Sequence, residues 1–232
     1  MSDLSYIDRN IERVRRDIEA AAYSAGRSPG EIRLLAAIKY TTPEQVARLK
    51  DCGITLVGEN RVQQLLDHEK APGLEGFEVH FIGKLQCNKV KYTVGRVSLV
   101  ESLDSLRLAE ELDRCSERAG KITDVLCEIN SGREENKSGI LPEEAAEFCA
   151  SLAGFRSLRL RGFMTMAPIC EKKADYRKYF EETYRTALDI WEKTLHNIGK
   201  PLLSMGMSDS FAEAIAEGAD IVRVGRALFA EE

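Results

Sequence analysis

The sequence predicts a (β/α)8 barrel, because short apolar runs alternate with longer amphipathic segments along almost the whole chain. Eight apolar runs have the length of a strand, and seven of the intervals between them can hold a helix. Alternation at this pitch implies a parallel sheet, and 232 residues approach the roughly 250 that are usual for this barrel. A doubly wound open sheet is the alternative, but no glycine-rich fingerprint follows the first strand.

An extra helix is expected before the first strand. Isoleucine and valine recur every three or four positions between residues 4 and 25, which predicts one amphipathic helix. The turn at residues 28–30, Ser-Pro-Gly, ends it, and the apolar run 34–38 follows. This run is too short to form a helix, and it has the composition of a strand that is buried on both faces.

The rest of the chain continues the alternation. Further strands are predicted at 55–57, 79–82, 97–100, 123–129, 158–163, 202–204 and 220–224. Helices are predicted at 43–50, 59–69, 103–119, 142–152, 173–196 and 208–217, with a short helix from residue 88 and a short closing segment. Because no linker, repeat or low-complexity tract interrupts the pattern, we expect residues 1–232 to form one domain.

The composition limits the classes of function. The net charge of -5 argues against binding to nucleic acid, which requires a basic face. No apolar run approaches the roughly twenty residues that span a membrane, and the N-terminus has no secretory signal. Six scattered cysteines without a CxxC pair predict reduced thiols in a cytoplasmic protein. Three histidines without ligand spacing predict that there is no metal site.

Lys39 stands at the carboxyl end of the first strand, the end at which such barrels carry their chemistry. Desolvation of its stem in apolar surroundings would lower the pKa of the amine and make it a nucleophile toward carbonyls. The simpler interpretation is that Lys39 reaches out to water. Lys39 alone favours the simpler interpretation, so the choice depends on the residues that follow the other strands.

The last two loops predict an anion site. Ser208 occupies a helix N-cap position, where the following free amides and the helix dipole attract an anion. Gly225 follows the eighth strand, where a backbone without a side chain lets a ligand approach closely. Phosphate sites in barrels usually lie between the loops after strands seven and eight, so we expect a phosphate next to Gly206, Ser208, Gly225 and Arg226. The alternatives are that Ser208 only caps its helix and that Arg226 is a solvated end residue.

Arg223 lies inside the apolar strand IVRVG, so its guanidinium must be paired or must point into the barrel mouth. It either donates to a ligand or pairs with a carboxylate, and the sequence favours neither. His80 is better explained as a satisfied, inward-facing histidine than as a base. Asn60 either contacts a ligand or caps the next helix, and Lys137 is by default a loop charge.

A lysine and a phosphate site across one barrel mouth permit two chemistries. One is a Schiff base with a phosphorylated sugar, as in aldolases, and the other is a Schiff base with pyridoxal phosphate. Arg223 favours the second, because an arginine that faces the pyridine nitrogen cannot accept its proton. The ring then stays neutral and is a weak electron sink.

Seven motifs occur in order along residues 33–229: AAIKY, GENRVQQ, HFIGKLQCNKVK, ENKSG, GFMTMAP, LSMGMSDSFAEAI and VRVGRALF. Together they resemble the YggS/PROSC family of pyridoxal phosphate homeostasis proteins. The resemblance implies an alanine-racemase-like N-terminal barrel that carries pyridoxal 5'-phosphate (PLP). It identifies Lys39 as the Schiff-base lysine and Arg223 as the residue facing the pyridine nitrogen. It also gives Ser208, Gly225 and Arg226 as phosphate-binding positions, and Asn60 and Met205 as pocket positions.

At Arg226 the family often has threonine, so we expect its backbone amide alone to bind phosphate. The resemblance also implies a carrier rather than an enzyme. Related racemases and decarboxylases add a β-domain and dimerise to complete their sites, whereas this chain ends soon after the eighth strand. We therefore expect a monomeric protein that has no catalytic residue. This protein would buffer or carry PLP, or deliver it to PLP-dependent apoenzymes. The alternatives are a minor amino-acid racemase that uses Lys137 or His80 as its base, and an aldolase-like barrel for sugar phosphates.

Overall fold

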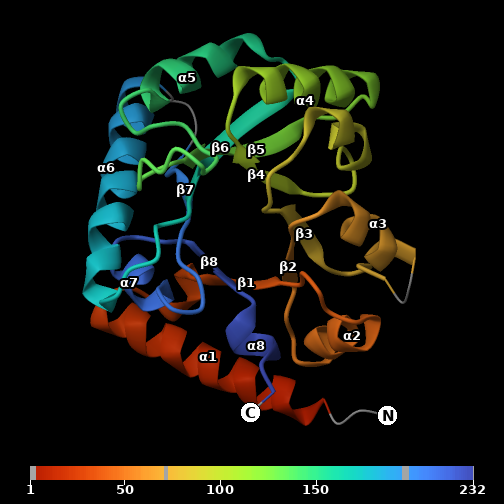
Figure 1. The fold of residues 1–232 in the computed structure, drawn as a ribbon, viewed down its shortest axis with the longest axis vertical. Coiled ribbons are helices and arrows are strands. Elements are labelled where there is room, and N and C mark those ends of the chain that lie inside the picture. Colours follow the sequence, from red (N-terminus) through yellow and green to blue (C-terminus); the bar gives the residue numbers. More distant parts are fainter. Residues whose placement is uncertain (1–3, 71–72, 195–198, 232) are drawn as a thin grey trace.

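A computed structural model shows a closed barrel of eight parallel strands surrounded by helices (Figure 1). It describes residues 4–70, 73–194 and 199–231. The strands follow one another around the barrel in chain order, and β8 pairs with β1 to close it. The predicted (β/α)8 barrel is confirmed, and the open-sheet alternative is wrong. The strands are β1 (Arg33–Ala37), β2 (Leu56–Glu59), β3 (Glu78–Phe81), β4 (Leu99–Leu103), β5 (Thr123–Ile129), β6 (Leu158–Thr165), β7 (Leu202–Ser204) and β8 (Ile221–Val224).

The helices differ from the prediction mainly at their ends. The helix predicted at 173–196 is a 3-10 turn followed by α6, and residues 195 and 196 lie outside the described ranges. The α-helices are α1 (Ser5–Ser24), α2 (Pro43–Asp51), α3 (Val62–Lys70), α4 (Leu106–Arg118), α5 (Ala145–Ser151), α6 (Arg177–Thr194), α7 (Phe211–Ala216) and α8 (Arg226–Phe229). The 3-10 helices are η1 (Pro29–Glu31), η2 (Cys87–Tyr92), η3 (Leu152–Gly154) and η4 (Lys173–Tyr176). Within the described ranges, no helix is long and apolar enough to cross a bilayer.

Side chains along each strand alternate between the barrel interior and the surrounding helices, as a pleated strand requires. The outward positions join the helices in one main core. The inward positions form two separate apolar clusters, which fill part of the interior as packed layers. One cluster contains Leu35, Ala37, Leu56, Ile82 and Ile221, and the other contains Leu99, Leu126 and Met164.

The expected extra N-terminal helix is confirmed. α1 lies along the outside of the barrel beside α7 and α8 (Figure 1). Asn10 on its buried face donates from Nδ2 to the backbone oxygens of Leu228 at 3.2 Å and Ala230 at 3.0 Å. The first helix therefore holds the last one against the closing strands. All six cysteines are free thiols.

Candidate functional site

Lys39 follows β1 at the carboxyl end of the barrel and lines a pocket of about 320 Å³ together with Gly225 and Arg226. Three residues predicted from distant parts of the sequence therefore meet in one place. The Lys39 side chain is exposed, which corrects the expectation of a stem enclosed by apolar groups, because Lys39 lies in the turn beyond the strand. Tyr40 follows with a φ of 63°, a left-handed conformation that is uncommon for a bulky residue. The guanidinium of Arg61 lies 5.4 Å from the centre of the Tyr40 ring.

The loops after β7 and β8 are tied together by side chains. Ser208 Oγ accepts a hydrogen bond of 3.2 Å from the amide of Ala227 in the first turn of α8. The guanidinium of Arg226 pairs with the carboxylate of Asp209. The residue at the N-cap of α7 is Ser210, so the N-cap prediction for Ser208 is wrong. Ser208 lies before that helix, where its hydroxyl joins the two loops.

The backbone amides of these two loops bear on the predicted anion site. In the part of the chain that the structure describes, the amides of Ser208, Asp209, Gly225 and Arg226 have no hydrogen-bond acceptor. Such unpaired amides on adjoining loops can donate to a phosphate. The predicted amide of Ser210 is not available, because it donates to the Met207 oxygen at 2.9 Å.

Gly206 and Met205 shape the start of the loop after β7. Gly206 has a φ of 88°, and a Cβ there would lie 2.6 Å from the Cβ of Ala214 and 2.9 Å from the Cα of Phe211. Only glycine fits this turn without displacing α7. The Met205 side chain is fully buried in the main core, so it supports the loop from behind.

Arg223 lies inside the barrel and is 4% exposed. Its Nη1 donates to Ser204 Oγ at 2.7 Å and its Nη2 donates to the Thr165 backbone oxygen at 2.8 Å. The Glu101 carboxylate lies 4.0 Å away. The structure shows the nearby carboxylate of the second interpretation, and donation from Arg223 to a ligand stays a prediction.

Polar residues of the interior were missed in the sequence. Glu101 is fully buried, and its carboxylate accepts hydrogen bonds from Ser204 Oγ at 2.5 Å and from His80 Nδ1 at 2.6 Å. Glu128 is 3% exposed, and burial, followed by the charge of Asp104, raises its pKa to about 7. The signal that revealed Arg223, a charge inside an apolar strand, would have found Glu128 in the strand predicted at 123–129, but not Glu101, which lies one residue beyond the strand predicted at 97–100. The prediction of a satisfied, inward-facing His80 is confirmed.

Asn60 follows β2, and its Oδ1 is buried without a hydrogen-bond partner among the described residues. The alternative in which this oxygen caps α3 is therefore wrong. Gly83 after β3 packs directly against the backbone of Asn60, since a Cβ at Gly83 would lie 2.2 Å from the Asn60 backbone oxygen. A buried polar atom without a partner is expensive, so Asn60 is suited to receive a hydrogen bond from a ligand. Lys137 is exposed in the loop after β5, as expected.

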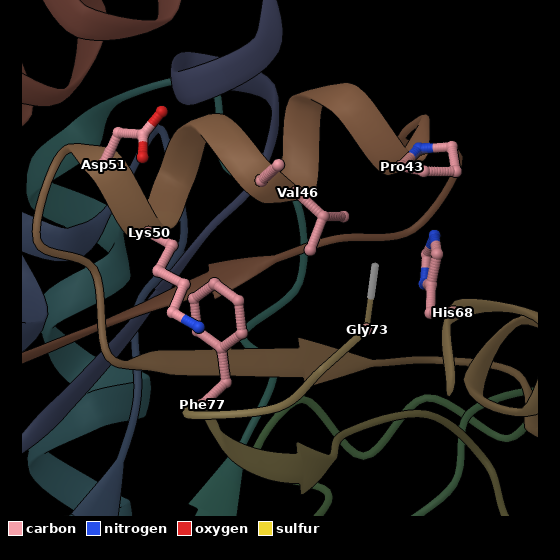
Figure 2. A pocket seen from close by; sticks show the side chains of 8 residues that line it. Pro43, Val46, Lys50, Asp51, His68, Gly73 and Phe77 are labelled. Atoms are coloured by element: carbon pink, nitrogen blue, oxygen red, sulfur yellow. The ribbon is translucent and has the colours of Figure 1, made fainter. Parts of the chain in front are cut away.

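A smaller pocket of about 130 Å³ lies outside the barrel, beside α2 (Figure 2). Figure 2 shows His68 next to Pro43 at one end of it and Phe77 at the other. His68 Nδ1 contacts the carboxylate of Glu59, the last residue of β2, and Nε2 lies 3.3 Å from the Thr41 backbone oxygen. The prediction that Glu59 begins a helix is wrong. This pocket shares no lining residue with the Lys39 pocket. Across residues 4–70, 73–194 and 199–231, no cluster of three His, Cys, Asp or Glu side chains could hold a metal ion.

The fold and the site define a (β/α)8 barrel with a lysine after its first strand, unpaired backbone amides on its last two loops and an arginine in its interior. The family model for the alanine racemase N-terminal domain matches residues 3–232. The chain is 39% identical over 221 residues to the pyridoxal phosphate homeostasis protein of Aquifex aeolicus, covering 95% of this chain and 96% of the relative. It is 37% identical over 235 residues to the protein of that name from Escherichia coli K12, covering 99% and 97%. The chain therefore belongs to the alanine racemase N-terminal domain family and, within it, to the family of pyridoxal phosphate homeostasis proteins.

Solved structures agree with this assignment. PipY of Synechococcus elongatus PCC7942 with PLP bound superposes with a TM-score of 0.83 at 26% identity, covering 97% of this chain and 100% of PipY. Alanine racemase of Corynebacterium glutamicum gives a TM-score of 0.74 at 16% identity, covering 99% of this chain and 61% of the racemase. The second likeness shows the shared barrel alone. The resemblance inferred from the seven motifs is confirmed.

Proposed function

We propose that this protein binds PLP and acts in the homeostasis of that cofactor by buffering, carrying or delivering it. The observation that carries the proposal is the convergence of Lys39, Gly225 and Arg226 on one pocket. The names of the relatives and the PLP bound to PipY support it.

The residues present fit the chemical groups of PLP. The unpaired amides of Ser208, Gly225 and Arg226 would bind the phosphate. The Arg226 side chain is engaged by Asp209, which leaves the amide of Arg226 as its phosphate donor. Arg223 would donate to the pyridine nitrogen, as a cation that cannot take up its proton. Neither Asn60 nor Met205 lines the Lys39 pocket. Asn60 would offer its unpaired Oδ1 to the cofactor, and the fully buried Met205 would support the loop after β7 from the core.

PLP supplies an aldehyde, and the unprotonated amine of Lys39 would condense with it to a Schiff base with loss of one water. We propose storage of the cofactor rather than strong turnover, because an unprotonated pyridine ring is a weak electron sink. His80 is a poor candidate for a base, since both of its ring nitrogens contact carboxylates. We further propose that the protein acts as a single-domain monomer in the cytoplasm and delivers PLP to apoenzymes, and the six free thiols support the reducing compartment.

The test is the visible absorption spectrum of the purified protein with added PLP, before and after borohydride. We expect a yellow band that borohydride bleaches, with the mass of the reduced cofactor fixed on Lys39. Lys39→Ala should abolish the band, whereas Lys137→Ala, which removes another exposed lysine, should keep it. No band with added PLP would refute the proposal. Deuterium exchange at the α-carbon of amino acids at enzymatic rates, lost in Lys39→Ala, would refute storage in favour of a racemase.

A further inference from the structure

Charged and polar side chains form a continuous line through the barrel interior, from the amino-terminal face to Arg223. At the face, Arg33 pairs with Glu78 at 2.6 Å, and both side chains are 41% exposed. Glu78 contacts Nε2 of His80 at 2.9 Å, and Nδ1 of His80 contacts Glu101 at 2.6 Å. Glu101 then meets Arg223 both directly, at 4.0 Å, and through the Ser204 hydroxyl. The two apolar clusters fill other parts of the interior.

The partners fix the protonation of this line. His80 lies between two carboxylates, which only accept hydrogen bonds when ionised, so both ring nitrogens must donate. Burial alone would lower the pKa of His80, but the hydrogen bonds to Glu101 and Glu78 outweigh burial and raise it. The charges therefore alternate in sign from Arg33 to Arg223, which stabilises each charge in a water-poor interior.

Ser204 fixes the geometry at the upper end of the line. Its hydroxyl proton goes to Glu101 at 2.5 Å, which leaves its lone pair to accept from Arg223 at 2.7 Å. With the second guanidinium nitrogen held by the Thr165 oxygen at 2.8 Å, the plane of Arg223 is set by two fixed acceptors. An apolar interior would stabilise the barrel equally well, because buried ion pairs add little net stability.

We propose that Glu101, held by His80 and Ser204, is a positioning residue that sets the orientation and charge of Arg223 toward the pyridine nitrogen of PLP. The inference rests on the proposed function. It makes PLP binding respond to protonation at the buried His80, which does not line the Lys39 pocket. Two carboxylates contact His80 directly, Glu78 on its own strand and Glu101 on β4. The other nearby charges act through these two: Arg33 pairs with Glu78, Arg223 lies next to Glu101, and Glu128 interacts with Arg223.

The first arm of the test uses the cofactor-free protein. Nitrogen NMR of the imidazole rings is practical because the chain has three histidines. We expect His80 to be doubly protonated at neutral pH, and Glu101→Gln to lower the pH at which it titrates by at least about one unit. Ser102→Ala is the matched control, because Ser102 is the buried neighbour of Glu101 and its Oγ has no partner among the described residues. A His80 that titrates equally in wild type and Glu101→Gln would overturn the proposal.

The second arm measures PLP affinity and the pH profile of the visible band. We expect Glu101→Gln to weaken PLP retention about tenfold and to lose the His80 component of the pH profile, with Ser102→Ala unchanged. Ser204→Ala keeps every charge and should weaken retention less, so it serves if Glu101→Gln does not fold. A folded Glu101→Gln or Ser204→Ala protein with wild-type affinity and pH profile would overturn this inference alone. Absence of PLP binding in the wild type would overturn the proposed function and this inference with it.

Discussion

Replacing Gly206 with alanine tests whether the tight turn after β7 shapes the anion site. The added Cβ would lie 2.6 Å from the Cβ of Ala214 and 2.9 Å from the Cα of Phe211, so α7 must shift. Overpacking of this kind costs about 1–3 kcal/mol, and the left-handed φ of 88° adds about 1 kcal/mol. We therefore expect the free energy of unfolding to fall by about 2–4 kcal/mol, which corresponds to a melting temperature lower by about 5–15 °C for a chain of this size.

Thermal unfolding followed by circular dichroism, with and without PLP, is the assay. Gly154→Ala is the matched control, because Gly154 has no positive φ and a Cβ there would meet no atom within 4 Å. The control should leave the melting temperature nearly unchanged. Gly206→Ala should also retain less PLP, since the displaced turn carries Ser208 and its amide. A Gly206→Ala protein that melts and binds PLP like the control would refute the reasoning that this turn is tight.

Three further substitutions have distinct expected outcomes. Asn10→Ala leaves the buried oxygen of Leu228 and the partly buried oxygen of Ala230 without this donor, so we expect a loss of about 2 kcal/mol of unfolding free energy and faster hydrogen exchange in α8. Protection equal to the wild type would contradict this. The pKa of Glu128 is raised above the unfolded value of 4.5 to about 7, so the folded state binds its proton more tightly and stability falls as pH rises through this window. Glu128→Gln should remove that fall, making the variant more stable than the wild type at pH 8 by about 3 kcal/mol in urea unfolding, and parallel pH profiles would count against it. Asn60→Ala should change the unfolding of the cofactor-free protein by less than about 0.5 kcal/mol, because its Oδ1 has no partner in the described structure, while PLP retention falls; a large loss of stability would show that Asn60 is structural.

The sequence was sufficient for the barrel because strand and helix alternate with a regular period. The bounds of β5 and β7 agree with the prediction at both ends. Lys39, Gly225 and Arg226 could be brought together because every loop after a strand lies at the same end of the barrel. These inferences depend on the order of elements rather than on side-chain contacts.

The details that were missed depend on contacts across the barrel. Glu101 was overlooked because β4 runs to Leu103, three residues beyond the predicted end. The serines of the Ser208-Asp209-Ser210 segment are equivalent as caps by local chemistry, and the partner of Ser208 is Ala227 in a different loop. Local pattern fixes neither the length of a strand nor the choice between two neighbouring serines.

The walls of the Lys39 pocket come from two segments far apart in the sequence. Residues 37–45 belong to the first strand and the loop after it, and residues 225–230 follow the last strand. These segments come at the ends of β1 and β8, and these two strands cannot pair until β8 has been synthesised. A ribosome-bound chain that lacks β8 therefore has the lysine but not Gly225 and Arg226, which line the other side of the pocket. We expect PLP to bind only after the barrel has closed. A ligand in this pocket would contact the segments after both the first and the last strand, so its binding would indicate that the whole barrel has folded.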